Sequence, residues 1–412
     1  MSLDAGAYVR LDGALAEVDA QLLAAYPGDS GARQPVHTVY VPADQFTFTL
    51  PDDWGALALA ALDAYLPDAA ALADVLGVEA TIAAEVLPRV RAKLTTEPIE
   101  DLRVDFEDGY GSHCDADEDA AARRAGHALA VTNLAFCGIR FKSLEPATRR
   151  RGIHTLDLVL GALPDTPLLP TGFVVTLPKV THVGQVQAFA EMCTELEKAH
   201  KLSPGTLRFE IQIETPQAIL AADGTAAVAR MVHSGVGRVV GLHYGTYDYS
   251  AACGVASPYQ SLDHAVADHA KAVMQLAAAG TGVRLSDGST NVLPVGSAAD
   301  IVAAWRVHAR LVRRSLERAY FQGWDLHPLH LVTRYAATYA FYREGMPAAC
   351  ERLRDYVEQA SSGVLDEPAT VKGMATLLVR GLQCGALDEI DVTYRSGVDI
   401  RELESLHRRQ VR

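Results

Sequence analysis

From residue 36 onward, short apolar runs alternate with longer helix-forming segments along the chain. The runs have the length and the residue types of buried strands. About eight strands separated by helices favour a closed (β/α)8 TIM barrel, and an open doubly wound sheet is the alternative. The open sheet would place a glycine-rich phosphate loop after its first strand, and the sequence has none there. The predicted strands are HTVYVP, LRVDFEDG, CGIRFKSL, GFVVTLPKV, TLRFEIQIE, GRVVGLHYG, STNVLPVG and RAYFQGWDLHP.

The chain divides into a predicted barrel at residues 1–329 and a predicted helical extension at residues 330–412. Two or three Ala/Leu-rich helices form an insertion at about residues 54–98, with breaks at Pro67 and Gly77. The extension has a predicted break at SSGVLDEP, residues 361–368, and we expect it to pack on the barrel or on a neighbouring subunit. Further helices are predicted at residues 5–25, 146–162, 181–201, 216–234, 260–279 and 297–317, and one begins in the acidic segment 115–119.

Charge and cysteine usage narrow the possible partners and location. Lys and Arg number 37 against 51 Asp and Glu, which gives a net charge of −14 and argues against nucleic acid or an anionic membrane as partner. The six cysteines include no CxxC pair, so we expect reduced thiols in a cytoplasmic protein. The start of the chain lacks the pattern of a signal peptide, and the run ALALAALDAYL is too short to span a bilayer.

Two carboxylates follow successive predicted strands. Phe209, Ile211 and Ile213 alternate with polar residues, which predicts a strand that ends at Glu214. Asp248 directly follows the next strand, VVGLHYG. Carboxylates at the ends of neighbouring parallel strands can share one divalent cation. The alternative is that Glu214 caps the helix behind it, with Thr215 at the cap position, and that Asp248 is a turn residue.

Other ionisable residues also fall where predicted strands end. In a (β/α)8 barrel these ends form the face that carries the active site. Carboxylates suit a cation, and an arginine fork suits a carboxylate substrate, so the set indicates a metal and a small carboxylic acid. The structural alternatives are that Lys179 pairs with an acid across the mouth and that His327 is a buried histidine. Asp105, Glu107 and Asp108 could also be structural partners of Arg140 and Lys142, and for Asp105 we expect this pairing. The set comprises Asp105, Glu107, Asp108, Arg140, Lys142, Lys179, Glu214, His243, Asp248, Asp325 and His327.

Seven segments between about residues 36 and 332 resemble, in order, motifs of one enzyme family. This is the citrate lyase beta-subunit/HpcH–HpaI aldolase family, which includes malyl-CoA and citramalyl-CoA lyases. The resemblance implies a (β/α)8 barrel that works with Mg²⁺ or Mn²⁺ and makes or breaks a carbon–carbon bond next to a carbonyl. The segments are VYVPAD, VDFEDGYG, IRFKS, LPKV, IQIETPQAI, GTYDYSAACG and WDLHPLH.

The resemblance also implies roles for individual residues. Glu214 and Asp248 would be the metal ligands, and Arg140 would bind the substrate carboxylate. Lys179 and Asp108 join Arg140 as expected catalytic residues, with Lys179 either near the substrate or paired with Glu107 or Asp108. Glu107 and His243 are expected to contribute to substrate binding. A homo-oligomer, trimer or hexamer, is expected, with subunit contacts from the helical tail.

Several positions differ from the family pattern. Lys142 replaces an asparagine, and Gln322 and Gly323 stand where the family has Gly-Lys before its last strand motif. A free oxo or hydroxy acid is therefore as good a substrate candidate as a coenzyme A thioester. Two other readings stay open: hydrolysis of a malyl-type thioester, and a non-catalytic relative that binds a metabolite.

Overall fold

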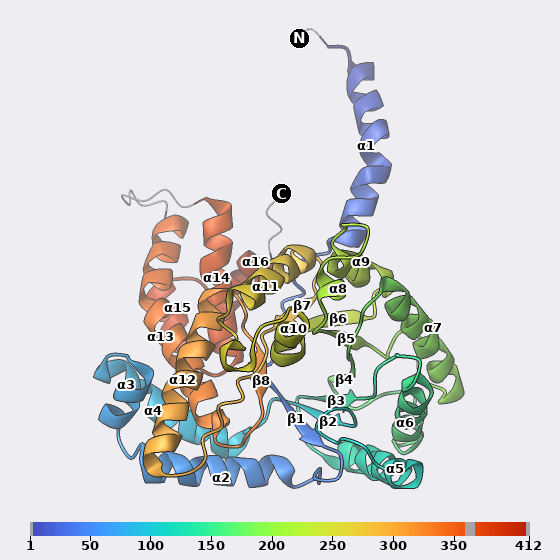
Figure 1. The fold of residues 1–412 in the computed structure, drawn as a ribbon. Helices are drawn as coiled ribbons and strands as arrows, with labels where there is room; N and C mark the ends of the chain where they lie inside the picture. Colours follow the sequence, from blue (N-terminus) through green and yellow to red (C-terminus); the bar gives the residue numbers. More distant parts are fainter. Residues whose placement is uncertain (1–2, 359–366, 409–412) are drawn as a thin grey trace.

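Eight parallel strands form a closed barrel in the computed structural model, which describes residues 3–358 and 367–408. The strands follow one another around the sheet in the order β7-β6-β5-β4-β3-β2-β1-β8, and a parallel bridge between Ser286 and Gln322 closes the ring. The predicted (β/α)8 barrel is thereby confirmed (Figure 1). The strands are β1 (His37–Pro42), β2 (Asp101–Asp105), β3 (Phe136–Arg140), β4 (Phe173–Leu177), β5 (Phe209–Ile213), β6 (Val239–Tyr244), β7 (Arg284–Ser286) and β8 (Gly323–Asp325).

Helices follow the strands as the apolar periodicity predicts. The insertion after β1 holds three helices, and their breaks lie at the expected Pro67 and Gly77. The acidic segment 115–119 begins a helix whose first turn carries Asp115, Asp117 and Glu118, as expected for acids near a helix amino end. The helices of the insertion and the barrel are α2 (Leu50–Tyr65), α3 (Ala69–Leu76), α4 (Ala80–Thr96), α5 (Asp115–Val131), α6 (Arg149–Gly161), α7 (Val183–Ala199), α8 (Pro216–Ile219), α9 (Ala227–Ser234), α10 (Thr246–Ala252), α11 (Ala265–Ala278) and α12 (Ala298–Glu317).

Two sequence predictions are wrong in detail. The expected strand at residues 289–296 is irregular, because Pro294 has no N–H to donate to a sheet, and the strand at this place in the barrel is β7. The single helix expected over residues 216–234 is split into α8 and α9. The split occurs at a turn where Gly224 adopts a φ of +81° and Asp223 accepts a hydrogen bond from the Thr225 backbone.

The carboxyl-terminal extension packs on the barrel and on the insertion. Its first helix is buried along most of its length against α12 and α4. Tyr335 donates a hydrogen bond to the Pro98 carbonyl at 3.0 Å, and Arg343 forms an ion pair with Glu85 of α4. Most of the predicted break at residues 361–368 lies outside the described residues. The extension comprises α13 (His330–Val357), α14 (Pro368–Gln383), α15 (Glu389–Ser396) and α16 (Ile400–Arg408).

The predicted amino-terminal helix is α1 (Ala5–Ala25), and it projects away from the rest of the molecule (Figure 1). The Asp4 side chain caps it by accepting a hydrogen bond from the Ala7 backbone at 2.7 Å. None of its 21 residues is buried. In the part of the chain that the structure describes, no single helix is long and apolar enough to cross a membrane, and only the bent pair α2 and α3 meets the criteria of length and composition together.

Candidate active site at the barrel mouth

Five strands bring charged side chains to the mouth at the carboxyl end of the barrel. Arg140 ends β3, Lys179 lies two residues beyond β4, and Glu214 directly follows β5. Glu107 lies two residues beyond β2 and, like Arg140 and Glu214, is buried. Asp248 lies in the first turn of α10, behind β6, and is exposed. These five residues, all predicted from strand ends, therefore share one face of the barrel.

Arg140 is held by a carboxylate from the neighbouring strand. Its Nε and Nη2 donate to the two oxygens of Asp105 at 2.7 and 2.5 Å, because the register of β2 and β3 places the residues side by side. The expected pairing of Asp105 is thus confirmed. The remaining nitrogen, Nη1, lies 3.4 Å from both Gln212 and Glu107. Arg140 therefore offers one N–H edge to the mouth, whereas the sequence analysis assigned its whole fork to a substrate carboxylate.

Lys179 connects the acids of the mouth from a strained backbone. It has a φ of +50°, a left-handed conformation that costs a non-glycine residue about 1 kcal/mol or more. Its Nζ contacts Glu107 at 2.5 Å and Asp108 at 2.6 Å, so the predicted pairing is confirmed. Its backbone N–H donates to Glu214 Oε1 at 2.6 Å. Burial lowers the pKa of Lys179, but the hydrogen bonds to Asp108 and Glu107 outweigh this and raise it above its usual range.

Glu214 is a buried carboxylate that forms no ion pair within the described residues. Its oxygens accept hydrogen bonds from the Lys179 backbone and from Gln212 Nε2, each at 2.6 Å. Burial raises its pKa well above the usual range, and the nearby negative charges of Glu107 and Asp248 add to the effect against the opposing charge of Arg140. The side chain does not cap α8, and Thr215 instead donates to the Val180 carbonyl at 2.6 Å. A cation would offset this concentration of negative charge.

Three other candidates form contacts outside this group of charged residues. Both ring nitrogens of His243 are engaged inside the barrel, where Trp324 donates to Nδ1 at 3.0 Å and Nε2 lies 2.9 Å from Glu210. Both contacts are within the protein, and a role of His243 in substrate binding stays a prediction. Lys142 donates to Glu118 at 2.7 Å, and His327 accepts from the Leu329 backbone through Nδ1 at 3.2 Å.

Gln322, one of the positions that differ from the family pattern, lies at the amino end of β8, opposite the mouth. Gln322 precedes β8, is buried, and donates to Thr38 at 2.8 Å near the start of β1. The lysine of the family pattern corresponds to the next residue, Gly323, which begins β8, and an added Cβ there would lie 2.9 Å from the Arg334 guanidinium.

The sequence analysis overlooked two residues next to Glu214. Gln212 orients Glu214 and faces Arg140, and the period-two alternation of β5, which places residues 210, 212 and 214 on one face, could have identified it. Gly245 lies against Glu214 so closely that an added Cβ would be 2.5 Å from the Glu214 Cβ. No pattern in the sequence marked this contact, because it depends on how β5 and β6 are paired.

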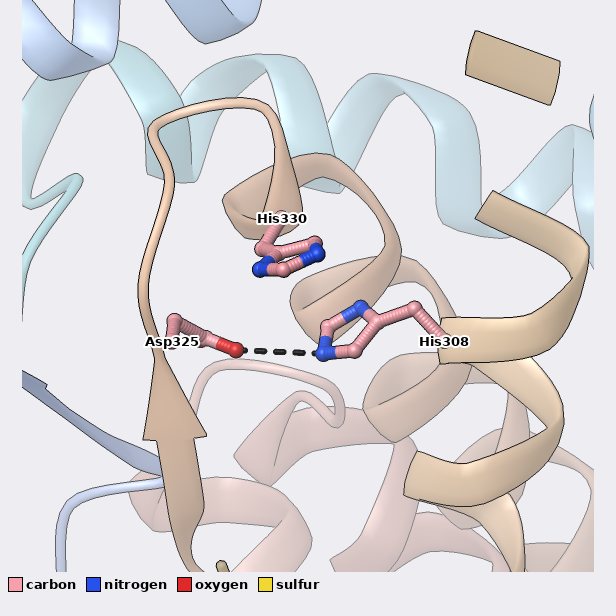
Figure 2. A group of neighbouring side chains, drawn as sticks. All are labelled: His308, Asp325 and His330. Carbon is pink, nitrogen blue, oxygen red and sulfur yellow. Dashed lines mark ion pairs between the residues drawn. The ribbon is translucent and has the colours of Figure 1, made fainter. Parts of the chain in front are cut away.

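A second group of ionisable side chains lies outside the barrel wall, between β8, α12 and α13. Figure 2 shows His308, Asp325 and His330 pointing toward one another, with potential ligand atoms all within 4.8 Å. Asp325 is already paired with Arg334 at 2.9 Å, with His37 at 2.8 Å and with His308 at 3.1 Å. The rings of His308 and His330 are stacked 4.4 Å apart at 23°, so they do not converge on one point. A cation bound to Asp325 would also lie against a guanidinium. We therefore interpret this group as the anchor of α12 and α13 on the barrel.

Several solved structures are similar to this chain. A citrate lyase from Burkholderia xenovorans LB400 has a similar structure, with a TM-score of 0.60 and 17% identity over 91% of this chain and 100% of that chain. CitE from Mycobacterium tuberculosis, in complex with magnesium, acetoacetate and coenzyme A, gives a TM-score of 0.49 and 18% identity over 86% and 99% of the two chains. Haloferax volcanii malate synthase gives 0.48 and 13% over 88% and 87%.

At such identities the likeness to the citrate lyase establishes a shared fold. A search of curated proteins found no match. A family model described as a domain of unknown function, DUF6986, matches residues 15–411, and the chain belongs to that family.

Proposed function

We propose that this protein is a divalent-metal-dependent carbon–carbon lyase or aldolase acting on a small oxo or hydroxy acid. The observation that carries the proposal is the buried carboxylate of Glu214, which lacks a cationic partner among the described residues and feels the charges of Glu107 and Asp248. The available donors are carboxylate oxygens, which are the ligands that Mg²⁺ and Mn²⁺ prefer. Glu214 and Asp248 would hold the ion. When bound, it would stabilise negative charge developing on a substrate oxygen during carbon–carbon cleavage.

Arg140 would orient the substrate carboxylate through its Nη1 edge. Asp105 binds the other two nitrogens of the guanidinium, Nε and Nη2, so the Nη1 edge is held in place before a substrate arrives. The positive charge also favours a substrate whose negative charge grows during the reaction. Gln212 lies beside the same edge and supplies a further polar contact.

Lys179 would act by charge and position. Its raised pKa keeps the amine protonated, and a protonated amine has no lone pair with which to form a Schiff base. The same side chain holds Glu107 and Asp108 together at the edge of the mouth. Asp108 is more exposed than Glu107 and would be the acid that exchanges a proton with solvent or substrate.

The substrate would be a small carboxylic acid, either free or as a coenzyme A thioester. Within this proposal, residues 1–329 form the catalytic barrel with its helical insertion. Residues 330–412 form the extension, and the functional particle is a homo-oligomer.

A cleavage screen with Mg²⁺ or Mn²⁺ tests the proposal, using malyl and citramalyl thioesters and 4-hydroxy-2-oxo acids as substrates. We expect metal-dependent release of a carbonyl product, loss of that release in Glu214→Gln, and its retention in the surface variant Glu195→Gln. Release of free thiol without a carbonyl product would favour a thioester hydrolase instead. Binding of the acid without any turnover would favour a non-catalytic metabolite-binding protein.

A further inference from the structure

An apolar stripe runs along α1 and is exposed over its whole length. The side chains at five positions of this stripe are between 45% and 57% exposed. Figure 1 shows the helix standing clear of the barrel, with only its carboxyl end on the body of the molecule. At that end the Tyr26 ring packs against His233, and the Gly28 backbone donates to the Gly280 carbonyl at 2.7 Å. The stripe consists of Tyr8, Leu11, Leu15, Val18 and Leu22, and Ala25 completes it.

The spacing of this stripe is that of a coiled coil. Its members are alternately three and four residues apart, which is the a/d pattern of a heptad repeat with a mean period of 3.5. A helix that lies on a globular core usually shows a wider stripe with a period of 3.6. Asp12 and Asp19 border the stripe on one side, and small residues, Ala7 and Ala14, border it on the other. The pattern therefore suits one narrow contact with a second helix.

A helix of this kind is not expected to be stable alone in water. Isolated helices gain little from propensity and depend on packing of an apolar face, and α1 also contains Gly6 and Gly13, which weaken a helix interior. Within residues 3–358 and 367–408, no segment covers the stripe. A second molecule can supply the covering element.

We propose that α1 pairs with α1 of a second copy of this chain, with the two helices running in opposite directions. In that direction the core layers join Tyr8 to Ala25, Leu11 to Leu22 and Leu15 to Val18. The largest side chain of the stripe, Tyr8, thus faces the smallest, Ala25. The other two layers pair aliphatic side chains of similar size. Because each α1 ends on its own barrel, opposite directions also place the two barrels at opposite ends of the pair (Figure 1).

The exposed apolar surface continues at the base of α1, where the carboxyl end of the helix meets the body of the molecule. Val236, which follows α9, and Leu276, on α11, are 81% and 80% exposed near the site where Tyr26 and Gly28 meet the body. In an antiparallel pair the amino-terminal tip of the partner helix reaches this base. A helix contact about 32 Å long together with this base lies near the lower end of specific interfaces, about 1,200 Å². We therefore expect association at micromolar concentration, strengthened by salt because the acidic edges approach one another.

Disulfide trapping tests both the pairing and its direction. In a background with Cys114→Ser and Cys253→Ser, which removes the exposed thiols, the variants Leu11→Cys and Leu22→Cys are mixed and mildly oxidised. We expect a disulfide between the two variants and none within either variant alone. The matched control is Gly13→Cys mixed with Ala20→Cys, two positions on the outer face of α1. Disulfides within each single variant would show parallel pairing, and equal rates in the control would show random collision; either result overturns the proposal.

The particle mass gives an independent test. Sedimentation equilibrium of the full chain at micromolar concentration should show a twofold lower mass for Leu15→Asp than for the unaltered protein. Ala20→Asp introduces the same charge on the outer face and should leave the mass unchanged. If Leu15→Asp has the mass of the unaltered protein, α1 does not mediate self-association.

Discussion

Replacing Asp325 by asparagine should destabilise the protein more than any single surface substitution. The carboxylate is completely buried and pairs with Arg334, His37 and His308. An asparagine at this position would keep the shape of the side chain but leave the Arg334 guanidinium buried without a counter-charge. Breaking a buried ion pair by removing one partner costs about 3–5 kcal/mol, so we expect a loss of that size in the free energy of unfolding.

The loss in free energy of unfolding caused by Asp325→Asn should become smaller as the pH falls. Burial raises the pKa of Asp325, but Arg334 and the hydrogen bonds from His308 and His37 dominate and hold it well below its usual range. A carboxyl with a lowered folded pKa contributes its full stabilisation above the unfolded pKa of about 3.9, and loses it as the pH falls toward the folded pKa. The difference between the unaltered protein and Asp325→Asn should therefore be constant above about pH 5 and shrink below about pH 4.

Urea unfolding followed by tryptophan fluorescence measures this difference, and Trp324 next to Asp325 reports on the region directly. The matched control is Asp63→Asn, which removes an exposed partner of Arg91 and should cost under about 1 kcal/mol. If Asp325→Asn lowers the free energy of unfolding no more than Asp63→Asn does, the group around Asp325 does not anchor α12 and α13. A difference that grows on acidification would refute the charge argument.

The mouth supports three further predictions. Glu214→Gln and Asp248→Asn should each weaken Mg²⁺ binding at least tenfold by calorimetry, and unchanged affinity in both would remove them as ligands. Gly245→Ala should displace Glu214, since the added Cβ would lie 2.5 Å from the Glu214 Cβ, and so weaken Mg²⁺ binding with little loss of fold by circular dichroism. Arg140→Lys should lower the melting temperature by several degrees as well as the turnover, because lysine cannot keep both contacts with Asp105; an unchanged melting temperature would show that the pair is not structural.

The alternation of strands and helices was sufficient to predict the barrel because each signal is local. Strand periodicity, helix propensity and turn residues are set by a few neighbouring residues, and seven of the eight strands overlap their predicted segments, β2 and β3 beginning one residue earlier. The exception is β7. The run STNVLPVG is apolar enough to resemble a strand, while the true strand, RLS, is too short to stand out.

The arrangement of the mouth depends on strand register, which one sequence does not contain. Pairing of Asp105 with Arg140 or Lys142 was expected, but the sequence does not decide between the two partners, nor does it show that Asp105 takes two of the three guanidinium nitrogens of Arg140. His243 lies on a correctly predicted strand, yet it contacts Glu210, four residues deeper in β5 than Glu214. The anchor around Asp325 was also missed, since it joins residues from α12, α13, β1 and β8 that are far apart along the chain.

The place where the barrel closes sets the order in which the nascent chain can be completed. The ring closes between β7 and β8, each three residues long, and β8 must also cover the free edge of β1, made almost three hundred residues earlier. Until β8 leaves the ribosome, both edges of the seven-stranded sheet remain open to pairing with other chains. Even then β8 brings the buried charge of Asp325, whose counter-charge Arg334 is made nine residues later in α13. The carboxyl-terminal extension is therefore the segment that commits the newly made sheet to a closed barrel.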